Sequence, residues 1–265
     1  MRGDCLAFCW KYRRLARNGP MQASRSRSQA DVFPLMLNVY DAGRMPVRHT
    51  RTYLAVAGGL AWAGVLVQLA VSIGTMDVGG LSLPEILWRL TGYFTILTNI
   101  VVATSYTARV VAPASALGRF FARTAVDSAV LAAITLVGAV YVLILQRLWE
   151  PKGAQLLADV LLHYVTPLGY IGYWVFLQPR GALQWRFVPL WLLYPCGYLA
   201  YAIARGALDG WYAYPFINVA AIGYGRTFAN ALGLIVIFSI VGLLIVALDK
   251  VLARFLVPVE ELRVG

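Results

Sequence analysis

Residues 228-FANALGLIVIFSIVGLLIVAL-248 form a continuous apolar stretch near the end of the chain, and none of them is charged. A helix needs about 20 mostly apolar residues to cross the hydrocarbon core of a bilayer, because each residue advances it by about 1.5 Å. This stretch therefore predicts a membrane-spanning helix, and it places the chain among membrane proteins.

Five further stretches have the same character. The sequence of 265 residues is 60% hydrophobic and only 13% charged, with a mean hydropathy of +0.68. Soluble domains carry about 25% charged residues. Six helices with short connections leave no room for a second folded domain. We expect an all-α polytopic membrane protein, a bundle of six transmembrane helices over residues 51–252, whose other spans lie near 53–73, 91–111, 125–146, 158–178 and 187–204.

The basic residues are distributed unevenly along the chain. Of 23 Lys and Arg residues, 18 lie before the first span or on the same side of the bundle as that segment, and 5 lie on the other side. Because basic residues favour the cytoplasmic side, we expect a multi-pass protein of the cell (inner) membrane with both termini in the cytoplasm. The net charge of +11 indicates affinity for anionic membrane lipids, and it does not indicate a nucleic-acid partner.

The two ends of the chain have a different composition. Residues 1–50 are basic, include 23-ASRSRSQ-29 and contain no continuous apolar run. They lack the apolar centre of a signal peptide, so we expect a disordered cytoplasmic tail. A reading frame that truly starts at Met45 is the alternative. Residues 253–265 are expected to form a second, short cytoplasmic tail.

The segment 93-YFTILTN-99 brings polar side chains to the start of the second predicted span. Thr95 and Asn99 are four residues apart and therefore share a helix face, with Thr98 displaced around the helix. If the span starts at position 91, Thr95 lies about 6 Å below the outer surface. Polar groups inside a membrane are costly, so such a cluster is a hypothesis for a functional site.

Other predicted spans place polar groups at the same depth. In 159-DVLLHYVTP-167, Asp159 and His163 again lie four residues apart on one face, and Gln68 of the first span falls at this level. The last outer loop is aromatic and suits a lid or an interfacial belt. The sequence therefore predicts one polar chamber near the outer side, covered or lined by the loop residues Trp211, Tyr214, Phe216 and Asn218.

Simpler structural explanations exist for most of these residues. A threonine in a membrane helix commonly bonds its own i−4 carbonyl or joins two helices, and Thr98 and Asn99 fit that explanation. Asp159 equally fits a position in the aqueous loop. His163 is the only histidine in the predicted membrane domain, and an imidazole near a hydroxyl is the minimum for nucleophilic catalysis. An interfacial ion pair accounts for the charges nearer the cytoplasmic side, Arg109, Arg123 and Asp127.

Three short motifs resemble the androgen-induced and androgen-dependent membrane protein family, in its bacterial branch. They are 93-YFTILTN-99, 163-HYVTPL-168 and 212-YAYPFIN-218 with Gly223, and the similarity covers about residues 52–250. Eukaryotic members of that family are six-span hydrolases that cleave fatty acid esters of hydroxy fatty acids with a threonine nucleophile and a histidine.

The resemblance implies that Thr95 is the nucleophile and His163 the essential histidine. Thr98 and Asn99 match the bacterial form of the motif without an assigned role. Eukaryotic members surround the histidine with further histidines, whereas His163 stands alone here.

We therefore expect an integral membrane lipid-ester hydrolase with a lipid ester as substrate. His163 would remove the proton of Thr95, Asp159 would orient the imidazole, and Asn99 or Gln68 would stabilise the oxyanion. A lone histidine among scattered acids does not form a metal site, and the chemistry needs no cofactor. The alternatives are a lipid or small-molecule carrier with His163 as a proton relay, or a non-catalytic scaffold. The sequence predicts no oligomeric state.

Overall fold

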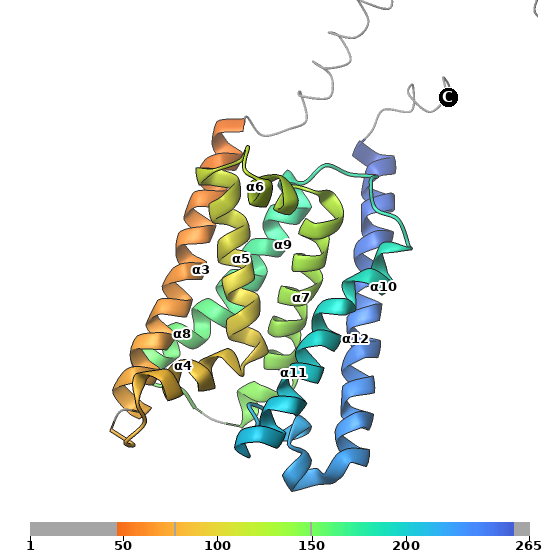
Figure 1. Cartoon of the computed structure of the whole chain (residues 1–265). Helices are drawn as coiled ribbons and strands as arrows, with labels where there is room; N and C mark the ends of the chain where they lie inside the picture. The colour runs from red at the N-terminus through yellow and green to blue at the C-terminus, as the bar shows by residue number, and fades with distance from the viewer. Residues whose placement is uncertain (1–46, 77, 149, 257–265) are drawn as a thin grey trace, which may run out of the picture. The chain divides into compact units, whose positions relative to one another are not determined.

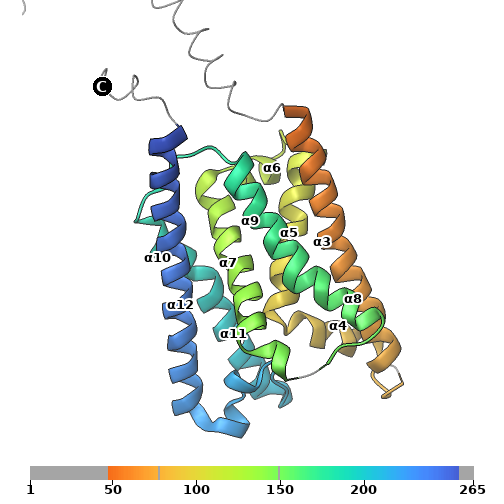
Figure 2. The same ribbon diagram turned by 180° about the vertical axis from the view of Figure 1, so that it is seen from behind.

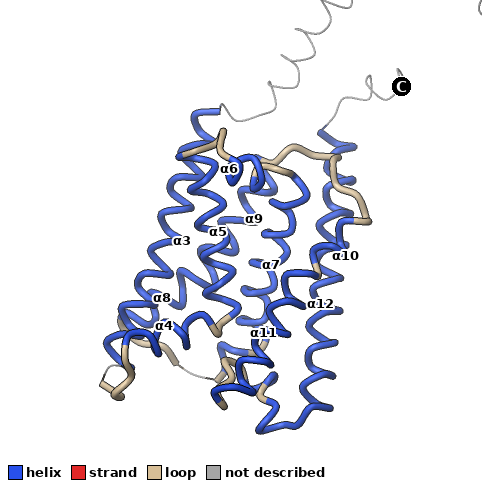
Figure 3. The backbone as a smooth tube through the Cα atoms, in the orientation of Figure 1, coloured by secondary structure: helices blue, strands red, loops and turns tan. Residues whose placement is uncertain are grey.

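The computed structural model describes residues 47–76, 78–148 and 150–256, and the structural statements below concern these residues. They fold into helices and connections, without a strand among them (Figure 3). Most of the two predicted tails, residues 1–50 and 253–265, lies outside the described residues.

Six helical segments are long and apolar enough to cross a membrane, in agreement with the six helical spans predicted from the sequence. Several of them are composites of consecutive helices. The segments are α3 (Val47–Met76), α5 (Phe94–Val111), α7 (Thr124–Leu143) with η1 (Leu145–Arg147), α8 (Ala154–Val160) with η2 (Leu161–Val165) and α9 (Thr166–Leu177), α10 (Phe187–Trp191) with α11 (Leu193–Asp209), and α12 (Val219–Leu256).

These segments run side by side as one bundle (Figures 1 and 2). The start of α3 and the end of α12 lie at the same end, which we call the terminal end, together with the short helix α6 (Ala116–Phe121). The opposite end, which we call the site end, carries α4 (Leu83–Thr91), η1 and the start of α8. The connection between α11 and α12, with η3 (Pro215–Ile217), lies at the site end as well.

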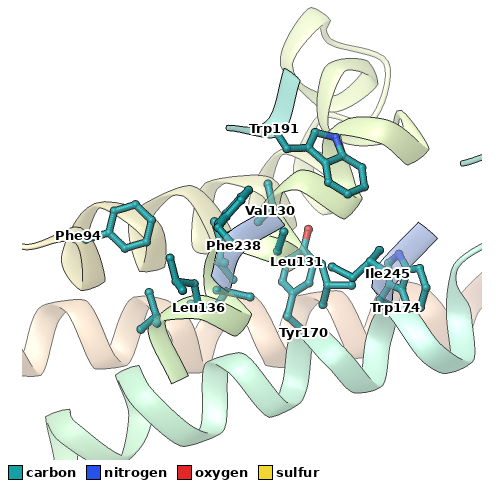
Figure 4. Close-up of a cluster of buried hydrophobic side chains, with 14 of the residues drawn as sticks. Phe94, Val130, Leu131, Leu136, Tyr170, Trp174, Trp191, Phe238 and Ile245 are labelled. Atoms are coloured by element: carbon teal, nitrogen blue, oxygen red, sulfur yellow. The ribbon is translucent and has the colours of Figure 1, made fainter. Parts of the chain in front are cut away.

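Large apolar and aromatic side chains fill the space between the helices. Tyr170 and Trp174 of α9 and Phe238 of α12 are almost fully buried, in one cluster with Val130 and Leu136 of α7 (Figure 4). Many other large apolar side chains are exposed on the outside of the bundle, as expected for helices that face lipid. In lipid, close packing of such side chains holds helices together, because burial from water supplies no driving force there.

Polar contacts add two fixed points toward the terminal end. Arg109 Nη1 lies 2.9 Å from Asp127 Oδ1, and both side chains are buried, so this pair joins α5 to α7. The ion pair expected from the sequence is therefore present between Arg109 and Asp127, both of them buried within the bundle, and Arg123 is not part of it. Asp249 of α12 accepts hydrogen bonds of 3.0 Å from the N–H groups of Gly181 and Leu183, which fixes the loop before α10.

Three spans differ from the predicted ones in ways that matter for the site. The second span begins at Phe94, because α4 and Tyr93 precede it at the site end, so Thr95 lies in the first helical turn and not one turn inside. The fourth span contains a π-helical turn at Leu161–Val165. The sixth begins at Val219 and is interrupted at Gly223, whose φ of 77° and ψ of 162° only glycine adopts readily.

Candidate functional site

A cavity of about 400 Å³ lies at the site end, and we call it the chamber. Its walls come from α3, α5, α7, the α8–η2 segment and the loop before η3. The predicted residues that line it are Gln68, Thr95, Asp159, His163 and Tyr214, and they are joined by Ser72, Tyr141 and Gln155. Side chains that are widely separated in the sequence thus share one polar space.

Thr95 occupies the second position of α5 and is 7% exposed. The hydrogen-bond ladder of this helix starts with the Leu97 N–H, which donates to the Tyr93 carbonyl over 3.2 Å. The N–H groups of Thr95 and Ile96 therefore precede the ladder, at the positive end of the helix dipole. A hydroxyl at this position lies beside backbone donors that can stabilise a negative oxygen.

Tyr214 reaches Thr95 from the loop between α11 and α12. Its hydroxyl lies 3.4 Å from both the Thr95 Oγ1 and the Thr95 backbone nitrogen. Its ring packs edge-on against Tyr93, with 5.7 Å between ring centroids, and stacks on Phe216 at 5.1 Å. Burial raises the pKa of Tyr214 to about 12, so its hydroxyl stays protonated near neutral pH and can donate a hydrogen bond.

His163 is held in one orientation by Asp159 and Tyr141. The imidazole Nδ1 lies 3.2 Å from Asp159 Oδ1 and 3.1 Å from the Asp159 carbonyl oxygen. The Tyr141 ring stacks on the imidazole at 4.0 Å, and its hydroxyl donates to Asp159 Oδ2. Because the Asp159 carbonyl oxygen can only accept a hydrogen bond, Nδ1 carries the proton of the neutral imidazole in this contact, which leaves Nε2 as the basic nitrogen.

The hydrogen-bond pair expected between nucleophile and base is not formed in this structure. Among the contacts of the described residues, no hydrogen bond joins Thr95 to His163, and Thr95 Oγ1 instead contacts the Tyr214 hydroxyl. Both side chains line the chamber.

Asn99 connects the two halves of the site from behind the chamber wall. Its Nδ2 donates to the Thr95 carbonyl over 2.9 Å and to the Leu162 carbonyl over 3.3 Å, and the residue is fully buried. Leu162 directly precedes His163 within the π turn, a feature that often occurs at functional sites. Both amide donors are engaged, and Asn99 does not line the chamber, so this placement favours a positioning role over the expected oxyanion role.

Thr98 and Gln68 have different placements. Thr98 is fully buried, its Oγ1 lies 3.1 Å from the Tyr194 hydroxyl of α11, and it does not line the chamber, which agrees with the structural explanation. Gln68 lines the chamber and exchanges amide hydrogen bonds with Gln155, of which the Gln155 Nε2 to Gln68 Oε1 bond is 2.8 Å long.

The predicted lid residues separate into distinct roles. Tyr214 lines the chamber, while Phe216 lines neighbouring cavities. Trp211 packs against Tyr93, with 5.5 Å between centroids, and does not line the chamber. Asn218 caps α12, because its Oδ1 accepts the Ala221 N–H over 3.1 Å.

A second, apolar cavity of about 70 Å³ adjoins the chamber, and we call it the slot. Thr95, Leu145 and Tyr214 line both spaces. The remaining walls of the slot are apolar or aromatic and include Phe94, Leu136, Val137, Tyr198 and Ala231. Thr95 thus lies at the junction of a polar space and an apolar space.

Sequence reasoning missed Tyr141, Gln155 and Tyr93. The motif 93-YFTILTN-99 includes Tyr93 but indicates no role for it. Tyr141 and Gln155 belong to no motif, although Tyr141 lies near the end of the third predicted span, at the depth of the other polar groups. Among the described residues, no three His, Cys, Asp or Glu side chains are grouped in a way that could hold a metal ion.

Comparison with known proteins adds no assignment: no family model, no curated protein and no solved structure matches this chain.

Proposed function

We propose that this chain is an integral membrane hydrolase of lipid esters, with Thr95 as nucleophile and His163 as general base. The observation that supports it best is the chamber, which is lined by both Thr95 and an imidazole whose Nδ1 lies 3.2 Å from Asp159 Oδ1. A hydroxyl, a base and a group that orients the base are the parts that nucleophilic ester hydrolysis requires. The resemblance of the sequence motifs to the androgen-induced and androgen-dependent membrane protein family points the same way.

In the first step, Thr95 Oγ1 attacks the ester carbonyl carbon and its proton passes to His163 Nε2. Because no direct hydrogen bond joins the two groups, a bridging water or a closing movement carries that transfer. The bond to the alcohol oxygen then breaks, and the leaving oxygen takes the proton from Nε2. An acyl-threonine remains in the site.

In the second step, a water molecule attacks the acyl-threonine. His163 Nε2 takes a proton from this water, and the bond between the acyl carbon and Thr95 Oγ1 breaks. Thr95 Oγ1 recovers its proton from Nε2, and a free fatty acid leaves. Asp159 keeps the imidazole in the required tautomer and stabilises its positive charge in both steps.

The negative oxygen of each intermediate would be stabilised at the start of α5. The donors would be the Tyr214 hydroxyl, which lies 3.4 Å from Thr95 Oγ1, and the N–H groups of Thr95 and Ile96 in the first turn of α5. Donors of this kind act mainly on the transition state, because its oxygen carries more charge than the ester carbonyl. The apolar slot next to Thr95, of about 70 Å³, would take the first carbons of the acyl chain.

The distribution of basic residues supports an orientation of the site end toward the outside of the cell (inner) membrane, with both termini in the cytoplasm. In that orientation the chamber lies near the level at which lipid ester groups are found.

Covalent labelling by a fluorophosphonate probe tests the proposal directly. We expect purified wild-type protein to be labelled, Thr95→Ala to be unlabelled, and His163→Ala to react at least about 100-fold more slowly, because general bases contribute about that much. Thr98→Ala is the matched control: it removes a hydroxyl from the same helix, outside the chamber, and should be labelled like the wild type. Labelling of Thr95→Ala at the wild-type rate would disprove the nucleophile.

The same variants distinguish a carrier from a hydrolase. A carrier with His163 as proton relay would lose transport in His163→Ala and keep it in Thr95→Ala. The hydrolase loses turnover of an ester substrate in both.

A further inference from the structure

A third recess opens at the side of the bundle near the site end. Its walls come from Ile144 and Leu148 after α7, from Pro215 and Phe216 of η3, and from the first turns of α12 at Ile222 and Arg226, and its volume is about 440 Å³. We call it the side recess.

The side recess shares wall residues with the chamber and with the slot, the two cavities that Thr95 lines. Leu148 and Pro215 line the side recess and the chamber, and Phe216 lines the side recess and the slot. The side chains of Leu148, Pro215 and Phe216 therefore form walls between the side recess and the two cavities that Thr95 lines. Two of the three walls belong to η3 in the loop that carries Tyr214.

Arg226 is the charged group of this recess. Its side chain is exposed, and among the contacts of the described residues it has neither an ion-pair nor a hydrogen-bond partner. The neighbouring amide of Asn230 is already engaged, since its Nδ2 donates to the Phe216 carbonyl over 2.9 Å. An arginine without a partner beside apolar walls leaves its guanidinium free for an anionic ligand.

The sequence of α12 fixes the depth of Arg226 in the bilayer. The residues between Arg226 and Asp249 are all uncharged, and at about 1.5 Å per residue they span about 33 Å. That length matches the hydrocarbon thickness of about 30 Å, so Arg226 lies at the headgroup level of one leaflet. The helical run that restarts after Gly223 also directs the positive end of its dipole toward this level.

We propose that the side recess binds a membrane glycerophospholipid, whose phosphate pairs with Arg226 and whose acyl chains lie along its apolar walls. The planar guanidinium matches a phosphate through two parallel hydrogen bonds, and phosphates are the anions that the bilayer offers at this level. This inference rests on the proposed function, under which the bound lipid is the substrate. Hydrolysis of one of its acyl esters by water yields a fatty acid and a lysophospholipid. The ester reaches Thr95 sideways, past Leu148 and Pro215.

Lipid binding to the purified full chain tests the site without relying on catalysis. Native mass spectrometry would compare dioleoyl phosphatidylglycerol with dioleoylglycerol, which has the same acyl chains and no phosphate. We expect the wild type to retain one phosphatidylglycerol and Arg226→Gln to bind that lipid about tenfold more weakly. Dioleoylglycerol should bind the wild type no better than it binds Arg226→Gln. Arg147→Gln is the matched control, because Arg147 is also exposed at the site end and does not line the recess.

Three results would overturn the site: equal binding by Arg226→Gln and the wild type, equal retention of the two lipids, or the same loss in Arg147→Gln. Tighter Arg226-dependent retention of oleate than of phosphatidylglycerol would also overturn the proposed phospholipid site, because the site would then bind a carboxylate in preference to a phosphate.

Turnover measurements separate this inference from the hydrolase itself. With phosphatidylglycerol as substrate, Arg226→Gln should raise KM about tenfold and leave kcat within about twofold, because Arg226 binds the lipid away from the reacting atoms. Thr95→Ala should bind phosphatidylglycerol like the wild type and release no fatty acid. Arg226-dependent binding by a wild type that hydrolyses no ester would disprove the hydrolase and keep the lipid site. Hydrolysis of other esters but not of phosphatidylglycerol would disprove the phospholipid as substrate.

Discussion

Thr95 owes its chemical setting to its place in the first turn of α5. A threonine one turn deeper would have its own N–H engaged in the helix ladder, whereas here the Thr95 N–H points toward the Tyr214 hydroxyl at 3.4 Å. The residue thus combines a hydroxyl with nearby hydrogen-bond donors. Of these donors, the Tyr214 hydroxyl is the one that a single substitution can remove without changing the backbone.

Replacing Tyr214 by Phe should lower kcat by about 100-fold, the loss that follows removal of one oxyanion donor. KM should change little, because the donor acts on the transition state. Steady-state hydrolysis of a lipid ester by purified protein measures both constants. Tyr212→Phe, in the same loop and outside the chamber, is the control and should retain wild-type kcat. Equal kcat values for Tyr214→Phe and the control would argue against a role for this hydroxyl.

Tyr214 should also make the folded chain sensitive to high pH. Burial raises its pKa from the ordinary value near 10 to about 12, so between these values the unfolded chain loses a proton that the folded chain keeps. Its contribution to stability is therefore complete below pH 10 and is lost as the pH rises through about 12. Thermal unfolding in detergent should show a smaller drop in Tm between pH 9.5 and pH 11.5 for Tyr214→Phe than for the wild type. An identical drop in both proteins would contradict the burial of this hydroxyl.

At the scale of elements, the hydrogen bonds of Asn99 connect α5 to the π turn η2, and they position the two halves of the site. Asn99 donates to carbonyls on both sides, and His163 follows directly after one of these carbonyls. The motif around Thr95 predicted that Asn99 shares a face with Thr95. It could not predict the partner at Leu162, because a π turn changes the rotation of every side chain that follows it.

Replacing Asn99 by Leu, of similar size and without donors, should destabilise the protein by about 1–2 kcal/mol, because the buried Leu162 carbonyl loses its side-chain donor. It should also lower kcat, since the backbone beside His163 would no longer be tied to α5. Denaturant unfolding and ester hydrolysis measure the two effects. Thr98→Val serves as the comparison on the same helix and should lose stability while keeping kcat. A lowered stability with unchanged kcat in Asn99→Leu would show that Asn99 is structural alone.

At the scale of the whole molecule, the six long helices could be predicted from the sequence because of the constraints that a bilayer places on the chain. Each crossing demands a long apolar helix, so the six spans were visible in the sequence. The bilayer places no such demand on short elements at its surface, and α4, which delays the start of α5, was missed. Contacts such as Tyr141 with His163 depend on how two helices are rotated against each other, and no motif records that rotation.

Under the proposed function, the slot adjoining Thr95 would limit the length of the acyl group that fits beside this residue. It is small, and its walls include Leu136 of α7 and Ala231 of α12. An acyl group that outgrows it must leave methylenes among the polar groups of the chamber, so kcat/KM should decline beyond a particular carbon number. Leu136→Ala should move that maximum toward longer esters in a series of 4-nitrophenyl esters of increasing length, and Ala231→Leu toward shorter ones. The sizes of the side chains at positions 136 and 231 would then set the preferred acyl length, although neither side chain contacts the ester bond.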